Sequence, residues 1–119
     1  MNRKKKIRIG REKDFAVGET KKFEFIRDGA STEGFIVRHA GGFSAYANSC
    51  AHVGAPLDYG DNDFFREEGD LLRCKTHGAL YDPASGECVG GPCLGAFLER
   101  FRVMREGDEI FVEIVYGPA

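Results

Sequence analysis

Long apolar runs are missing from this 119-residue sequence. The apolar stretches that it has are short, such as Phe35-Ile36-Val37 and Ile110-Phe111-Val112, whereas a membrane-spanning helix needs about 20 apolar residues. The basic start resembles the first part of a signal peptide, but charged residues interrupt the apolar region that should follow it. We therefore expect a soluble, cytoplasmic protein with no membrane partner.

Basic charge is scarce beyond the first residues. Residues 1–13 hold seven Lys or Arg and one Glu, a net charge of +6, and the remaining residues carry a net charge of −8, which together give −2. An acidic body argues against nucleic acid as the main partner. We interpret the basic start as a solvated, partly frayed terminus; the alternative is a docking arm for an acidic redox partner.

Nucleotide-binding motifs are absent and cysteines are few. No G-x-G-x-x-G sequence occurs, so nothing indicates a flavin or nicotinamide site. Four cysteines without a secretion signal do not suggest a disulfide framework, and a metal role for some of them is favoured. The length fits one compact domain, residues 1–119.

Two short clusters each pair a thiol with an imidazole: Cys50-Ala51-His52 and Cys74-Lys75-Thr76-His77. Two Cys and two His are the ligand set of a [2Fe–2S] centre in which His replaces Cys on one iron. A Cys₂His₂ zinc site uses the same residue types, but its usual short spacings pair Cys with Cys and His with His. A Cys–His nucleophilic pair would leave two of the four residues unused. Both remain alternatives, as do four unrelated buried residues.

Apolar residues alternate with polar ones at period 2 around residues 22–25, 100–103 and 111–114, as in half-buried strands. Residues 35–38 and 43–47 flank Gly41-Gly42, and Gly107-Asp108 separates the last two runs; both pairs are typical of hairpin turns. No window shows a helical stripe. The sequence predicts an all-β fold, with two cluster-bearing loops between about residues 48 and 93.

These motifs resemble those of Rieske-type iron–sulfur proteins, over roughly residues 10–116. The matching segments are 50–57, 74–82, Gly86-Glu87 and Gly91-Pro92. The resemblance implies one [2Fe–2S] cluster per chain, with Cys50 and Cys74 on one iron and His52 and His77 on the other, near the surface. It marks further residues around the cluster, the last of them in a covering proline loop: Gly54, Pro56, Gly78, Tyr81 and Pro92.

The resemblance also implies three antiparallel sheets, with a cluster-binding subdomain inserted in a β base. We place the subdomain at about residues 46–94 and the base at about 7–45 and 95–116. Three positions indicate the branch of the Rieske family to which the sequence is similar. Ala55 and Thr76 stand where the high-potential members carry the two cysteines of a disulfide, and Ala79 stands where those members carry a Ser. These departures predict the ferredoxin branch and a reduction potential in the lower Rieske range, which the hydroxyl of Tyr81 raises slightly.

Two features depart from the ferredoxin pattern. The connection between His52 and Cys74, residues 53–73, is longer than in most ferredoxin members. We interpret the extra length as an enlarged hairpin or loop; the alternative is a surface for docking a partner through Phe64 or Phe65. Cys88 and Cys93 are not assigned as ligands; we interpret them as buried small side chains, with a labile disulfide as the alternative. The third histidine, His39, is expected at an exposed strand end.

The sequence therefore predicts a monomeric one-electron carrier, a component of an oxidoreductase system and not a catalyst on its own. Its partners would be a reductase as donor and a terminal oxygenase or other oxidoreductase as acceptor. The first alternative is a small Rieske-like subunit of a nitrite-reductase-type enzyme. The second is a zinc-binding structural or regulatory module.

Overall fold

The computed structural model describes residues 3–51, 54–58 and 60–116. In these ranges the chain is almost entirely strands and turns, so the all-β prediction is confirmed. No helix among the described residues has the length and apolarity needed to cross a bilayer. The elements are β1 (Arg3–Arg11), η1 (Glu12–Asp14), β2 (Thr20–Arg27), β3 (Ala30–His39), β4 (Gly42–Ala47), β5 (Leu72–Arg73), β6 (Leu80–Tyr81), β7 (Cys88–Gly90), β8 (Arg100–Glu106) and β9 (Glu109–Tyr116).

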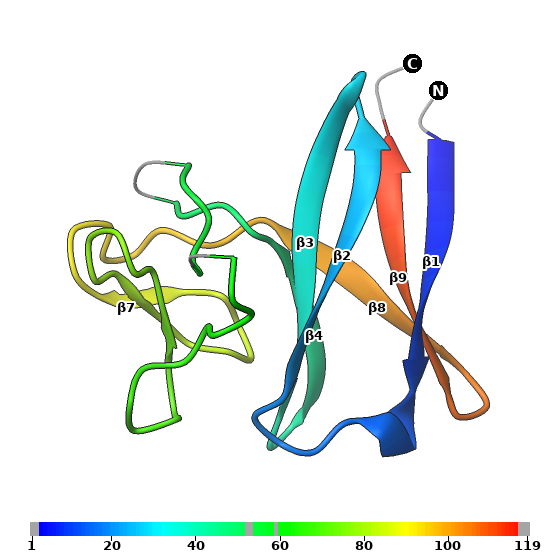
Figure 1. Ribbon diagram of the computed structural model, residues 1–119, viewed down its shortest axis with the longest axis horizontal. Coiled ribbons are helices and arrows are strands. Elements are labelled where there is room, and N and C mark those ends of the chain that lie inside the picture. Colours follow the sequence, from blue (N-terminus) through cyan, green and yellow to red (C-terminus); the bar gives the residue numbers. More distant parts are fainter. Residues whose placement is uncertain (1–2, 52–53, 59, 117–119) are drawn as a thin grey trace.

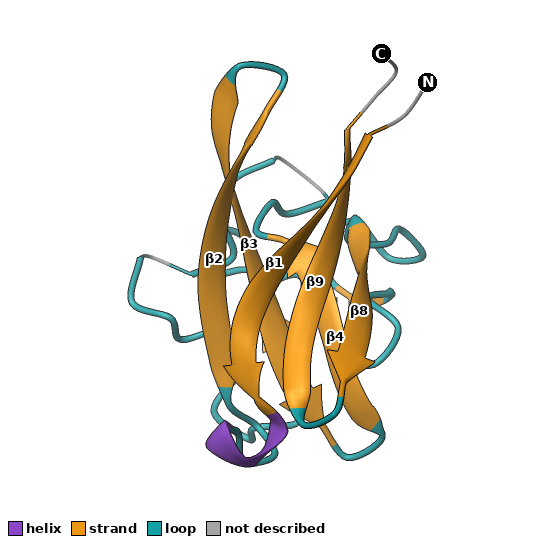
Figure 2. Ribbon diagram, turned by 90° about the vertical axis from the view of Figure 1, so that its right-hand side faces the viewer, coloured by secondary structure: helices purple, strands orange, loops and turns teal. Residues whose placement is uncertain are grey.

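The base is an antiparallel sheet in the order β1-β9-β8-β4-β3-β2, and a smaller sheet has the order β5-β6-β7. Only two residue pairs, Ala45 with Phe101 and Tyr46 with Arg100, join β4 to β8. The base therefore consists of two three-stranded ladders, β1-β9-β8 and β4-β3-β2, which this narrow junction joins. Together with the small sheet they correspond to the three sheets that the resemblance implies. The base curls until its edge strands meet (Figure 2), where Lys21 Nζ donates to the Ile9 carbonyl at 2.7 Å.

The middle of β3, residues 34–37, is buried on both faces, because it separates two hydrophobic cores. Phe35 and Val37 point into the core beneath the cluster-bearing loops, while Ile36 points into the core of the base. This is the period-2 alternation of a strand, with apolar residues on both sides. In Figure 1 the loops and the small sheet lie to one side of β3 and β4, and the rest of the base lies to the other.

Three tight turns set the register of the base. Both predicted hairpins are present, and they join β3 to β4 and β8 to β9. The second turn is Gly107-Asp108 as expected, whereas the first is Ala40-Gly41, because Gly42 pairs with His39 and begins β4. A third hairpin, at Asp28-Gly29, joins β2 to β3 and was not predicted. Both of its residues have positive φ, 53° and 78°, as a type I′ turn requires, so the Asp-Gly pair was a readable signal.

Two expectations were wrong. The basic start is not frayed, because β1 pairs with β9 from Arg3 to Arg11, apart from a bulge between Arg8 and Gly10 where Ile9 is buried. Its lysines Lys4, Lys5 and Lys6 are exposed, as expected. His39 does end β3, but it is half-buried and both ring nitrogens are engaged, Nε2 with Ser44 Oγ at 2.9 Å and Nδ1 with the Gly41 N–H at 3.1 Å. Burial lowers the pKa of His39.

Candidate iron–sulfur site

The two cysteine loops have matching backbone geometry. In the first, the Cys50 N–H donates to the Ala55 carbonyl and the Gly54 N–H donates back to the Cys50 carbonyl, both at 2.7 Å. In the second, bonds of 2.9 and 2.8 Å make the same connections among Cys74, Ala79 and Gly78. The glycines have φ of 76° and 75°, a conformation that side chains disfavour. Each loop thus bends tightly around its cysteine.

The structure brings the two cysteine thiols together inside the protein. Cys50 is 2% exposed and Cys74 is 0% exposed. Burial, followed by a hydrogen bond with the Cys50 thiol, raises the pKa of Cys74. The Cys74 thiol therefore resists losing its proton, whereas a bound cation favours the thiolate. This pair therefore fits the sulfur half of the expected cluster site.

The histidine half is only partly described. His77 follows Cys74 in the second loop and is exposed, which fits a ligand to an iron near the surface. His52, and Val53 after it, lie outside the described residues. Within the described ranges, no three His, Cys, Asp or Glu side chains gather in a metal-binding arrangement. The set of four ligands therefore stays a prediction.

Tyr81 connects the first cysteine loop to the small sheet. Its side chain is fully buried, and its Oη lies 3.2 Å from Cys50 Sγ and 3.1 Å from the Ala51 N–H. Burial, with the Cys50 hydrogen bond second, raises the pKa of Tyr81, so the hydroxyl keeps its proton. A Cys50 thiolate has no proton of its own, so Tyr81 would donate to it. On the other side, Oη lies 3.2 Å from Cys93 Sγ.

Removing this hydroxyl should lower the reduction potential. A hydrogen bond to a ligand sulfur favours the reduced, more negative cluster, and a net value of about 1 kcal/mol corresponds to about 40 mV for one electron. We therefore expect Tyr81→Phe to lower the potential by about that amount in a redox titration. Tyr46→Phe is the matched control, because Tyr46 is equally buried but donates to the Pro83 carbonyl. An unchanged potential in Tyr81→Phe would remove the tuning role.

The proline loop lies against the second cysteine loop. A Cβ on Gly91 would come within 2.9 Å of Ala79 Cα, and Gly91 has φ of 92°, so only glycine allows this approach. Pro92 beside it is exposed. Pro56, after the first loop, is exposed as well. Both prolines thus lie at the surface around the loops, and their role toward a cluster stays a prediction.

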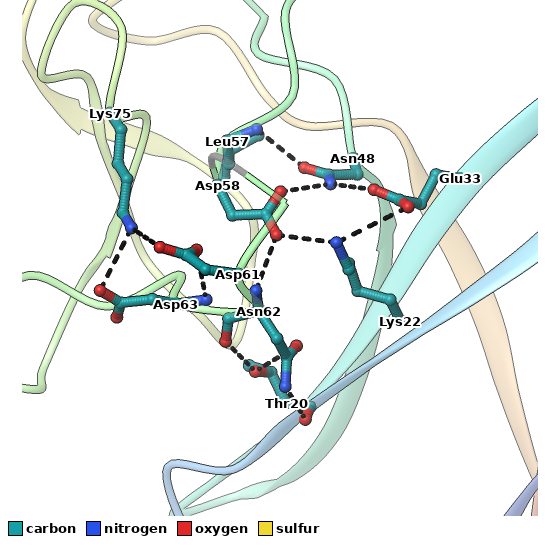
Figure 3. A network of polar contacts seen from close by, with 10 residues as sticks. All are labelled: Thr20, Lys22, Glu33, Asn48, Leu57, Asp58, Asp61, Asn62, Asp63 and Lys75. Atoms are coloured by element: carbon teal, nitrogen blue, oxygen red, sulfur yellow. Dashed lines mark hydrogen bonds and ion pairs between the residues drawn. The ribbon is translucent and has the colours of Figure 1, made fainter.

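Leu57 and Asn48 close the first loop and tie it to the second (Figure 3). The Asn48 side chain accepts from the Leu57 N–H at 2.8 Å, and its amide donates to Asp58 at 2.9 Å and to Glu33 of β3. The Leu57 carbonyl accepts from the Lys75 N–H at 2.9 Å. The backbone of Leu57 therefore holds both loops at a fixed separation.

The long 53–73 connection braces the second loop, and Phe64 to Arg73 within it form a short hairpin. Lys75 Nζ binds Asp61 at 2.6 Å and Asp63 at 3.2 Å (Figure 3). The Asn62 side chain is hydrogen-bonded to Thr20 of β2. Neither Lys75 nor Asn48 was predicted to support the site. The only signal for Lys75 was the pair Asp61 and Asp63, and the sequence does not show which basic side chain such a pair contacts.

Asp58 should make the fold sensitive to acid. Burial opposes its ionisation, but bonds from Asn48, Lys22 and the Asn62 N–H outweigh this and lower the pKa of Asp58. A lowered pKa contributes stability above the unfolded value, about 3.9, and this stability is lost as pH falls through the folded value. Asp58→Asn should lower the free energy of unfolding by about 2 to 3 kcal/mol at neutral pH. The difference in this free energy between wild type and variant should shrink below pH 4.

Urea unfolding from pH 7 to pH 3, followed by circular dichroism, measures this difference. Asp61→Asn is the control, because Asp61 belongs to the same network but is exposed, and exposed pairs contribute little. If the difference in free energy of unfolding between wild type and Asp58→Asn stayed constant down to pH 3, the stabilising role of ionised Asp58 would be contradicted.

Comparisons with known proteins agree with this geometry. The family described as Rieske [2Fe-2S] domain matches residues 5–106. A ferredoxin of carbazole 1,9a-dioxygenase from Nocardioides aromaticivorans IC177 is 27% identical, with a TM-score of 0.64 over 90% of this chain and 95% of that one. A chain in a complex of reduced oxygenase and oxidised ferredoxin of carbazole 1,9a-dioxygenase is 25% identical, with a TM-score of 0.67 over 90% and 91%.

A curated relative is the iron–sulfur subunit of a toluene-4-sulfonate monooxygenase system from Comamonas testosteroni. It is 46% identical over 48 residues, which are 40% of this chain but only 12% of the relative. The resemblance to that larger protein is therefore confined to a short segment. The match over residues 5–106, with the paired cysteine loops, shows that the chain belongs to the Rieske [2Fe-2S] domain family and has a [2Fe–2S] cluster as its cofactor.

Proposed function

We propose that this chain is a one-electron carrier, which takes electrons from a reductase and passes them to a terminal oxygenase. The observation that carries the proposal is its likeness to a dioxygenase ferredoxin over nearly the full length of both chains. The likeness to a chain of an oxygenase–ferredoxin complex supports the same partner class.

The ligands in this proposal are Cys50 and Cys74 on one iron and His52 and His77 on the other. When bound, the cluster supplies a centre that accepts and releases one electron. The chain keeps water from the sulfur side through the burial of both cysteines, and Tyr81 orients a hydrogen bond toward Cys50. The exposed position of His77 offers a partner a short path for the electron. The subdomain of residues 46–94 and its base are part of the same proposal.

Function and location can be tested together. Purified protein should hold about two irons and two labile sulfides per chain and give a Rieske-type EPR signal on reduction; one zinc and no colour would support the zinc-binding alternative instead. In native extract, a carrier elutes from a sizing column as a free monomer, while stable co-elution with nitrite-reducing activity would favour the subunit alternative. We also propose a cytoplasmic location, since none of the four cysteines, all of which lie within the described residues, forms a disulfide; cell fractionation checks it.

A further inference from the structure

Two cysteines outside the ligand set lie side by side behind Tyr81. Cys93 Sγ is 3.0 Å from Cys88 Sγ, and both thiols are free. Cys88 lies in β7 and is fully buried, while Cys93 lies in the turn that follows and is half-buried. The six-residue segment between and including them contains Gly91-Pro92 of the proline loop.

We propose that Cys88 and Cys93 are an oxidisable dithiol, which a low-molecular-weight disulfide such as glutathione disulfide converts to an intramolecular disulfide beside the cluster site. A disulfide bond is about 2.05 Å long, so the two sulfurs need to approach by only about 1 Å. The backbone already holds both residues in place: Gly95 donates to the Cys88 carbonyl at 3.0 Å, and Ala96 donates to the Cys93 carbonyl at 2.9 Å.

The exposure of the two thiols sets the order of the reaction. Cys93 is the one that an external disulfide can reach, so its thiolate attacks one glutathione sulfur and releases the first glutathione. The Cys88 thiolate then attacks Cys93 Sγ, which breaks the mixed disulfide, forms the protein disulfide and releases the second glutathione. The two thiol protons pass to the departing thiolates, so the protein loses two hydrogens and the oxidant gains them. Burial raises the pKa of Cys93, and we expect the exchange to take hours at neutral pH.

The disulfide would alter the hydrogen bonding of Tyr81; this step rests on the proposed role of Cys50 as a ligand. The Cys93 S–H donates to Cys88 Sγ, so Cys93 Sγ faces Tyr81 as an acceptor, and the single proton of Tyr81 is shared between Cys50 and Cys93. A disulfide would draw Cys93 Sγ toward Cys88 and leave Cys50 as the main sulfur acceptor for this proton. The Tyr81 bond to Cys50 would then strengthen, which raises the reduction potential. The thiol pair thereby couples the redox state of the surroundings to that of the cluster.

Peptide mass spectrometry tests the disulfide itself. Holoprotein that has been reduced and desalted is incubated with glutathione disulfide without oxygen, quenched with acid and alkylated. We expect a Cys88–Cys93 cross-link, two alkylated cysteines where the reduced protein shows four, unchanged cluster absorption and reversal by dithiothreitol. Cys88→Ala should stop at the Cys93–glutathione adduct, and Cys93→Ala should form neither product. A wild-type protein that stays unmodified, or that accumulates the adduct, would overturn the proposal.

Redox titration of the reduced and oxidised forms tests the coupling. The disulfide form should have the higher potential, and Tyr81→Phe should form the disulfide without any shift in potential. A wild-type disulfide that leaves the potential unchanged would overturn the coupling. The mass measurement does not depend on electron transfer. Failure of the carrier function would appear as absent iron and an absent EPR signal, whereas failure of the dithiol would appear as an absent Cys88–Cys93 cross-link.

Discussion

Replacing Cys74 by alanine is expected to abolish cluster binding, from about two irons per chain to almost none. Cys74 is fully buried beside Cys50, whereas His77, the other proposed ligand of the second loop, is exposed. A [2Fe–2S] cluster with one thiolate missing loses both a bond and a charge that hold one iron. Iron analysis, visible absorption and EPR of the reduced protein measure the effect.

The sequence offers a matched control for this variant. Cys88 is also fully buried, lies in the adjoining small sheet and is not a proposed ligand. Cys88→Ala should therefore keep about two irons and the Rieske-type signal. Circular dichroism of Cys74→Ala checks that the strands are still formed. If Cys74→Ala retained two irons, the ligand assignment would be wrong, whatever the family.

Phe64→Ala is expected to destabilise the protein by about 3 to 5 kcal/mol. Phe64 is 1% exposed and stacks on Phe35 of β3, with ring centroids 4.1 Å apart and an interplanar angle of 20°. Its carbonyl accepts from the Arg73 N–H at 2.7 Å, directly before Cys74. The variant therefore leaves a cavity between the long connection and the sheet, and it loosens the strand that leads into the second cysteine loop.

Thermal and urea unfolding measure this loss, which corresponds to a melting temperature lower by about 10 to 20 °C. Phe65→Ala is the control, because the neighbouring ring is only half-buried and should cost clearly less. The burial of Phe64 also excludes it from the docking surface considered from the sequence. A loss below 1 kcal/mol would mean that the stack does not form in solution.

Much of the fold was readable because strands and turns are local. Alternation at period 2 located the base strands, and the Gly41-Gly42 pair located a hairpin. The start of the chain was misread because its basic charge suggested a solvated terminus, although Ile7 and Ile9 alternate with Lys6 and Arg8 as in a strand. Its pairing with β9, at the other end of the chain, could not be read from local sequence. The hairpin at Asp28-Gly29, between β2 and β3, was missed although its turn residues signal it.

The candidate site divides in the same way. The spacing of Cys50 and Cys74 with their histidines predicted the metal type, and Tyr81 was expected next to a cysteine, where it lies. The contact of Tyr81 with Cys93, and of Lys75 with two aspartates, could not be predicted, because these side chains meet only after the small sheet and the long connection have packed. Networks of this kind depend on tertiary geometry and leave no periodic signal.

The pairing of the first strand with the last has a consequence for how the protein is made. Strand β9 holds β1 on one side and β8 on the other, yet it is the last of these strands to be synthesised. Both cysteine loops leave the ribosome before β8 and β9, so they rest on an unfinished base sheet at that stage. Such distant pairings also form slowly. Assembly of the metal centre therefore depends on strands that are made after its ligands.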